Sequence, residues 1–164
     1  MKTKNIKRKN KAILTMGLPG AGKSYILETR YQKELHQSVV IDPDLEKQSH
    51  PDYDPSKPEL IHEWSKEKAK AKLLKAIAEK KNLIIDGTGT NLEKMIKYIV
   101  DLQGNGYDVT LVYVKVSLKT SMKRNKLRER VVPESIIREK AEYVATSYET
   151  LSQIVDKIEV HNNE

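Results

Sequence analysis

The chain has 164 residues, which is the length of one ordinary domain and enough to bury a hydrophobic core. It contains no cysteine, and this excludes disulfide scaffolds, zinc–thiolate and iron–sulfur sites and cysteine nucleophiles. Thirty lysines and arginines against 23 acidic residues give a net charge of +7, which permits an anionic partner without identifying one.

The amino-terminal segment is basic and does not have the pattern of a signal peptide. Residues 1–11 carry six basic and no acidic side chains, and the apolar stretch that follows is too short for a signal peptide. No apolar run approaches the ~18 residues of a membrane span. We therefore expect a cytoplasmic protein without a membrane partner. Residues 1–11 are either a solvated, frayed terminus or an arm that contacts polyanions.

Five short apolar runs predict the strands of a sheet. Most show little polar alternation, which is typical of buried parallel strands. The first run ends at Gly17, the second at Asp42 and the third at Asp86. The runs cover residues 12–16, 38–41, 83–85, 109–116 and, more weakly, 157–160.

Helical periodicity fills the intervals between these runs. Residues 24–36 predict one helix, and Pro58 is expected to open another that continues to about Glu79, because proline suits the first helical turn. Residues 42–58 contain four prolines and predict a long ordered loop. Two later helices have apolar faces, one formed by Leu92, Met95, Ile96, Ile99 and Val100, the other by Ile137, Ala141, Val144, Tyr148 and Leu151.

The alternation of strands and helices predicts an α/β fold. We expect a parallel sheet covered by helices on both faces, in one domain over residues 1–164. Ligands bind such sheets outside the carboxyl ends of the strands. The residues that follow the first three strands are therefore the candidates for chemistry.

Residues 17–24, Gly-Leu-Pro-Gly-Ala-Gly-Lys-Ser, match the phosphate-binding pattern G-x-x-x-x-G-K-[ST] in full. The glycines let the backbone approach phosphates, and the loop N–H groups and the following helix start favour negative charge. Lys23 would lie between the β- and γ-phosphates, and the Ser24 hydroxyl is a ligand that Mg²⁺ accepts. The motif predicts ATP and Mg²⁺ binding by Gly17, Gly20, Ala21, Gly22, Lys23 and Ser24.

Among P-loop proteins, the sequence favours a small kinase. A GTPase needs Asn-Lys-x-Asp, but Asn125-Lys126 is followed by Leu127-Arg128, and motors and helicases need more chain. A kinase needs a base at the acceptor hydroxyl, a loop that holds the substrate, and arginines that neutralise the transferred group.

Acidic residues after the second and third strands are the candidates for the base and the substrate loop. A carboxylate at Asp42 or Asp44 can take the acceptor's proton or hold a Mg²⁺-bound water, although both residues are also common in turns and caps. Asp86 opens a polar loop with Thr88 and Thr90. That loop can hold substrate, lead to a helix cap at Thr90 or Asn91, or do both.

Residues 123–130 carry five basic side chains and one acidic one. A solvated helix face is the ordinary explanation of such a run. Arg124, Arg128 and Arg130 favour phosphate contact, because arginine keeps its charge and presents a planar fork. A hinged segment here can close over ATP as a basic lid.

Together these motifs resemble the zeta-toxin and polynucleotide-kinase branch of small P-loop kinases, from the first strand to about Leu151. The resemblance implies a five-stranded parallel sheet and makes Asp44 the catalytic base. His50-Pro51-Asp52-Tyr53 looks like the His-Pro element of zeta-type kinases, and residues 83–89 correspond to their substrate loop.

The lid segment is similar instead to that of phage-type polynucleotide 5′-kinases, and Lys47 falls where those kinases have an arginine that contacts substrate phosphate. Motifs and resemblance thus give catalytic roles to Lys23, Asp44, Arg124, Arg128 and Arg130, substrate contacts to Asp42, Lys47, Asp86 and Thr88, and Mg²⁺ contacts to Ser24 and Asp42.

Three hypotheses for the function remain open. The first is a kinase acting on a nucleic-acid hydroxyl, either a 5′-end or a hydroxymethylated base, and its support is the lid, the charge and the basic runs at residues 2–11 and 66–81. The second is a zeta-like kinase acting on a UDP-sugar or another small metabolite, supported by the His-Pro element and the Asp86 loop. The third is a non-catalytic ATP-dependent nucleic-acid-binding module. The sequence does not identify a protein partner.

Overall fold

A computed structural model describes residues 10–57, 61–87, 89–129 and 131–164, and the structural statements below concern these residues. Most of the basic arm (residues 1–9), the helix start expected at Pro58, and the candidate site residues Thr88 and Arg130 lie outside them. No helix in the described ranges combines the length and the apolar character that a membrane crossing requires.

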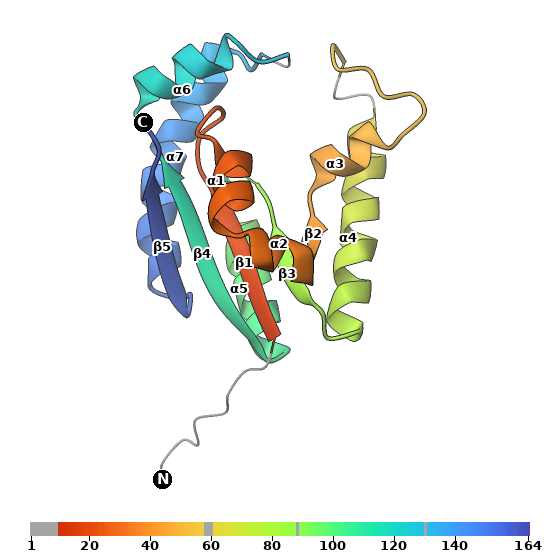
Figure 1. The fold of residues 1–164 in the computed structure, drawn as a ribbon. Coiled ribbons are helices and arrows are strands. Elements are labelled where there is room, and N and C mark those ends of the chain that lie inside the picture. The colour runs from red at the N-terminus through yellow and green to blue at the C-terminus, as the bar shows by residue number, and fades with distance from the viewer. Residues whose placement is uncertain (1–9, 58–60, 88, 130) are drawn as a thin grey trace.

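Five strands form one parallel sheet in the order β2-β3-β1-β4-β5 (Figure 1). The central strand β1 is paired on both sides, so that Leu14 lies opposite Ile85 of β3 and Leu111 of β4. The predicted α/β class and five-stranded parallel sheet are confirmed. The strands are β1 (Asn10–Met16), β2 (Ser38–Ile41), β3 (Asn82–Ile85), β4 (Tyr107–Lys115) and β5 (Lys157–Asn162).

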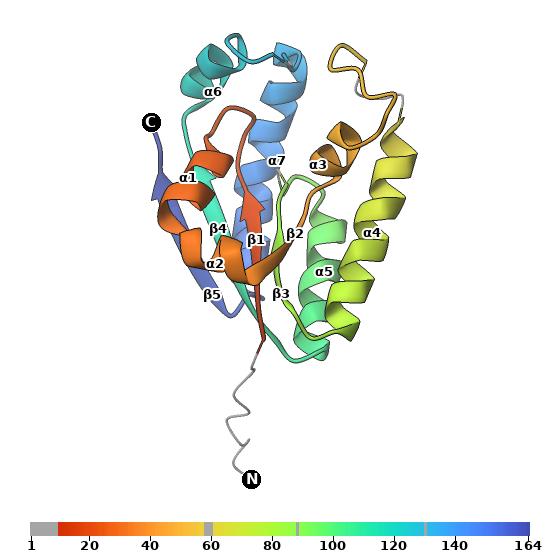
Figure 2. The same ribbon diagram turned by 45° about the vertical axis from the view of Figure 1, so that its right-hand side comes forward.

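Helices cover both faces of the sheet. Figures 1 and 2 show α1 and α2 on one face and α5 and α7 on the other, while α3 and α6 stand near the carboxyl ends of the strands. That edge is where the candidate site residues were expected. The helices are α1 (Lys23–Arg30), α2 (Gln32–Gln37), α3 (Pro43–Gln48), α4 (His62–Ala78), α5 (Leu92–Gly104), α6 (Leu118–Asn125) and α7 (Glu134–Ser152).

Three local predictions were wrong. The loop expected over residues 42–58 contains α3, because Asp42 caps the helix and Pro43 occupies the first turn, where proline is tolerated. The helix expected over residues 24–36 is divided into α1 and α2 at Tyr31, whose backbone leaves the helical region. Val100 was placed on the apolar face of α5 but is exposed.

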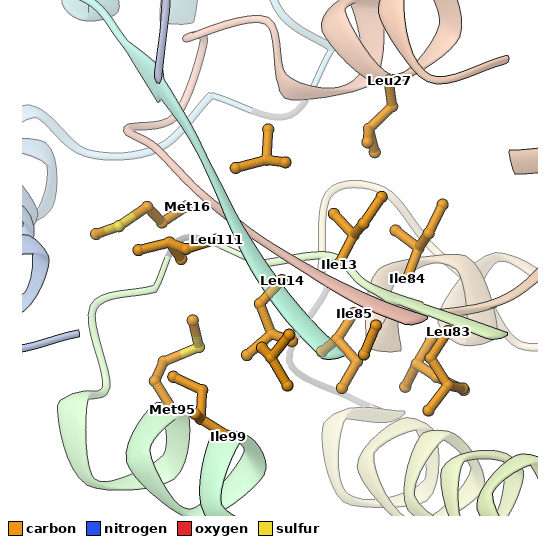
Figure 3. Packing of buried hydrophobic residues seen from close by; sticks show 14 of the residues in the cluster. Ile13, Leu14, Met16, Leu27, Leu83, Ile84, Ile85, Met95, Ile99 and Leu111 are labelled. Carbon is orange, nitrogen blue, oxygen red and sulfur yellow. The ribbon is translucent and has the colours of Figure 1, made fainter. Parts of the chain in front are cut away.

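The hydrophobic core holds the sheet between its helices. Figure 3 shows Ile13 and Ile84 on the side of α1, whereas Leu14 lies on the side of α5, as alternation along a strand requires. The apolar stripe of α7 is buried at Ile137, Val144 and Leu151, as predicted. A close-packed sheet of this kind is a firm base for the loops at its carboxyl edge.

Candidate active site

The loop between β1 and α1 has the shape of a phosphate cradle. Gly20 and Gly22 have φ angles of +76° and +89°, which glycine adopts without a steric penalty. A Cβ atom on Gly17 would lie 2.7 Å from the carbonyl oxygen of Val114, and one on Gly22 would meet the side chain of Asn163. The loop therefore requires its glycines, as a backbone that approaches phosphates would.

Lys23 begins α1, and its side chain curls back over the loop. Its Nζ donates to the carbonyl oxygen of Gly17 at 3.2 Å and lies 3.5 Å from that of Leu18. Burial lowers the pKa of Lys23 to about 8, a shift that the carboxylate of Asp86 opposes. The positive charges of Arg128 and Lys140 lower this pKa further. Charged side chains from α7, from the loop after β3 and from the segment after α6 thus act together on Lys23.

Two carboxylates lie opposite Lys23, at the ends of neighbouring strands. Burial and the charge of Asp86 raise the pKa of Asp42 to about 6, while the bond from the Asp44 N–H to Asp42 Oδ1 (2.9 Å) opposes the rise. The backbone N–H of Asp86 donates to Ile41, and its carboxylate accepts a 2.6 Å bond from Thr15. Asp42 is therefore both a helix cap and a neighbour of Asp86.

Asp44 and Lys47 lie one turn apart on α3. The Asp44 side chain is 59% exposed, so an acceptor can reach it, whereas the Lys47 side chain is only 4% exposed. Their charged atoms are 3.9 Å apart. Glu46 turns to the other side and pairs with Lys72 of α4 at 3.3 Å. The sequence resemblance had connected Asp44 and Lys47 with the substrate, and the structure puts the two side chains together.

The arginines of the expected lid have different surroundings. Arg124 lies behind the cradle, with Nη1 3.4 Å from the carbonyl oxygens of both Gly20 and Ala21. Arg128 is close enough to Lys23 to lower its pKa. Asn125 joins the two ends of the segment that contains Arg128, through bonds of 2.9 and 2.6 Å with the backbone of Val132. Arg124 thus lies against the backbone of the loop, while the charge of Arg128 acts on Lys23.

Three residues near the cradle had not been singled out from the sequence. Lys140 lies between Ile137 and Ala141 of the α7 stripe in sequence, and its charge acts on Lys23. Asn163, beyond β5, donates to the carbonyl oxygen of Ala21 at 2.8 Å. No sequence motif marks either residue. Thr15 could have been noticed, because it is a hydroxyl within the apolar run of β1.

A groove of about 590 Å³ lies between the start of α5 and residues 136–147 of α7, and its lining includes Lys140, whose charge acts on Lys23. Asn91 caps α5 there, as the cap prediction allowed, by accepting from the N–H of Lys94. The lining combines ring, aliphatic, hydroxyl and acidic groups, and Tyr143 is 52% exposed. Its members include Thr90, Glu93, Ile136, Glu139, Lys140 and Tyr143.

The residues present fit Mg²⁺ bound together with a nucleotide. Nowhere in the described ranges do three acidic, histidine or cysteine side chains gather as a metal cage. Mg²⁺ does not require one, since it usually takes one or two protein oxygens and completes its shell with phosphates and water. Ser24, exposed at the start of α1, and Asp42 are suitable donors at the mouth of the cradle.

A sequence model of the zeta-toxin family matches residues 1–164. The chain belongs to the zeta-toxin family. A zeta toxin from Enterococcus hirae is 31% identical to it over 114 residues, which are 63% of this chain and 38% of that toxin. The chain therefore spans well under half the length of this curated relative.

Solved structures with the same fold include toxins and repair enzymes. A structure from the PezAT toxin–antitoxin system of Streptococcus pneumoniae has a TM-score of 0.80 at 20% identity, and the match covers 94% of this chain and 69% of that one. A chain of the Pnkp1/Rnl/Hen1 RNA repair complex has a TM-score of 0.69 at 18% identity, covering 92% and 49%. These likenesses show a shared P-loop kinase fold.

Proposed function

We propose that this zeta-toxin family member is an ATP-dependent kinase that transfers the γ-phosphoryl group to an alcohol. The observation that carries the proposal is the convergence of charge at the cradle. Lys23, Arg128 and Lys140 bring positive charge to the site that phosphates would occupy, and Asp42 and Asp86 lie opposite. A site of this kind stabilises charge that develops during phosphoryl transfer.

Each residue has a defined part in the proposed reaction. The carboxylate of Asp44 accepts the proton of the acceptor hydroxyl as its oxygen bonds to the γ-phosphorus, and the bond from that phosphorus to the β,γ-bridging oxygen breaks to release ADP. Lys23 and Arg128 neutralise the negative charge on the phosphate oxygens. Mg²⁺, held by Ser24 and Asp42, supplies further positive charge when bound.

The groove between α5 and α7 supports a compact acceptor, such as a UDP-sugar or another small metabolite. Tyr143 and Ile136 offer apolar surface on which a ring can lie, and Lys140 belongs both to the groove and to the surroundings of Lys23. Glu93 and Glu139 add negative charge, which favours an uncharged ring or sugar over a phosphate group in the groove itself.

A nucleic-acid acceptor is the second candidate, favoured by the outer surface of α4. Lys66, Lys70 and Lys75 are exposed there, and Lys68 lies 4.8 Å from the centre of the Trp64 ring. Lysines beside an exposed ring are typical of single-strand binding. Part of this charge is internally balanced, because Lys68 and Lys72 pair with Glu46 and Lys66 pairs with Glu63.

Labelled ATP separates the two acceptors. The protein is incubated with γ-labelled ATP and Mg²⁺ and with UDP-sugars, nucleosides, single-stranded RNA or DNA, at several salt concentrations. A nucleic-acid acceptor should lose affinity by roughly 0.7 log units per log unit of salt for each phosphate contacted, whereas a compact acceptor should show a shallow dependence. Tyr143→Ala should raise KM for a compact acceptor only. Transfer to polynucleotides alone would overturn the first choice.

A further inference from the structure

Thr15 is a buried polar residue in the central strand, two positions before the P-loop begins. It stands between Leu14 and Met16 in β1 and is only 1% exposed. Its hydroxyl does not bond within its own strand pairings. It donates to Asp86 Oδ1 at 2.6 Å and accepts from the backbone N–H of Gly87 at 3.0 Å. Both partners belong to the loop that follows β3.

The packing of β1 does not by itself explain a hydroxyl at this position. Valine has nearly the shape of threonine and suits a buried strand, while a buried hydroxyl without a partner is unfavourable. The hydroxyl of Thr15 has two partners, and β-branching restricts its χ1 rotamer. Thr15 therefore offers a fixed donor and a fixed acceptor to the start of the 86–90 loop.

These bonds complete the attachment of Asp86 to the sheet. Its backbone N–H already donates to Ile41 of β2 on one side, and Thr15 holds its carboxylate from β1 on the other. With one oxygen bound to Thr15, the carboxylate keeps an orientation in which its charge acts on Lys23 and Asp42. Thr15 itself is buried in β1, beneath the site, and bonds to the loop after β3.

We infer that Thr15 is a positioning residue, which fixes the Asp86 carboxylate and the first peptide of the substrate loop relative to the P-loop lysine. The inference rests on the proposed kinase function for its effect on turnover. Its geometric part, the hydrogen bonds that join Thr15 to Asp86 and Gly87, is independent of which acceptor is used.

The test compares Thr15→Val, which keeps the shape of the side chain and removes the hydroxyl, with Thr15→Ser, which keeps the hydroxyl. Thr15→Val should lower kcat by about tenfold or more and leave the affinity for ATP within about twofold, and Thr15→Ser should restore most of the loss. Thr29→Val is the matched control, because the Thr29 hydroxyl donates to the carbonyl oxygen of Tyr25 within α1 and lies on the surface. It should leave kcat unchanged.

A double-mutant cycle with Asp86→Asn distinguishes positioning from general destabilisation. If Thr15 acts through Asp86, Thr15→Val should reduce kcat far less in the Asp86→Asn background than in the wild type. The inference would be overturned if Thr15→Val lowered kcat by the same factor in both backgrounds. It would also be overturned if Thr15→Ser lowered kcat as much as Thr15→Val. If Thr15→Val does not fold at the assay temperature, Thr15→Ala takes its place in the cycle.

A second readout needs no acceptor and so separates this inference from the kinase proposal. The backbone N–H of Gly87 donates to the Thr15 hydroxyl, so removal of that hydroxyl should speed the exchange of the Gly87 amide hydrogen with solvent. Thr15→Val should show faster exchange at Gly87 than the wild type, and Thr15→Ser should not. Faster exchange in Thr15→Val together with no phosphoryl transfer by the wild type would contradict the kinase proposal alone. Unchanged exchange at Gly87 in Thr15→Val would contradict the positioning role.

Discussion

Replacing Asp42 by asparagine should make the folded protein more stable at neutral and alkaline pH, although Asp42 belongs to the candidate active site. In the folded chain, burial and the neighbouring charge of Asp86 disfavour the ionised form of Asp42. Asparagine removes this charge and keeps an oxygen that can accept from the N–H of Asp44, so the cap of α3 is retained.

The size of the effect follows from the raised pKa. The folded pKa of Asp42 is about 6 against 3.8 for an ordinary aspartate, and one pH unit corresponds to about 1.4 kcal/mol. Because the pKa of Asp42 is higher in the folded protein than in the unfolded chain, protonation of Asp42 stabilises the folded protein. This stabilisation is complete below pH 3.8 and is lost as the pH rises through 6. The free energy of unfolding of Asp42→Asn should therefore exceed that of the wild type by roughly 3 kcal/mol at pH 8. The difference should be about half as large near pH 5 and almost nothing below pH 4.

Chemical denaturation at pH 8, 5 and 4 measures this difference directly, and thermal unfolding at pH 8 should show a rise of roughly 6–12 °C. Asp101→Asn, an exposed aspartate on α5, is the control and should show no such trend. The same Asp42→Asn protein should transfer phosphate more slowly and require a higher Mg²⁺ concentration, so that activity falls while stability rises. A stability difference that is absent at pH 8, or that does not change with pH, would refute the burial of Asp42 beside the charge of Asp86.

Three other predictions concern the cradle and the base. The pKa of Lys23 is about 8, and phosphates favour its charged form, so ATP binding at pH 8 should take up roughly half a proton. Calorimetry in buffers of different ionisation enthalpy detects this uptake, and Lys23→Met should abolish it. Asp44→Asn should lower turnover by roughly 10²-fold with ATP affinity unchanged, and a wild-type rate would remove Asp44 as the base. Asn163→Ala should weaken ATP binding about fivefold, the equivalent of ~1 kcal/mol for one hydrogen bond, and unchanged binding in equilibrium dialysis would contradict its role behind the P-loop.

The sequence predicted those features that depend on local pattern. Apolar runs located the five strands of the sheet. The spacing of Gly17, Gly22 and Lys23 marked the loop between β1 and α1, in which Gly20 and Gly22 have positive φ angles. The helix α3 was missed because the prolines of the segment suggested irregular chain, whereas Pro43 follows a capping aspartate and therefore starts a helix.

Residues that reach the site through tertiary packing could not be predicted. Lys140 is surrounded in sequence by the apolar stripe of α7, and its proximity to Lys23 depends on how that helix crosses the sheet. Asn163 is 142 positions from Ala21, its hydrogen-bond partner. The different surroundings of Arg124 and Arg128 depend on where α6 ends, a boundary that composition does not fix.

Phosphorus NMR can follow phosphoryl transfer from ATP to an alcohol in a reaction that contains the protein, ATP, Mg²⁺ and an acceptor from the compact or polynucleotide class. We expect ADP and a new phosphomonoester resonance to appear together in equal amounts. Lys23→Ala should abolish both while its circular dichroism spectrum matches that of the wild type. ATP that stays intact with every acceptor, or ADP that accumulates together with inorganic phosphate alone, would contradict phosphoryl transfer to an alcohol.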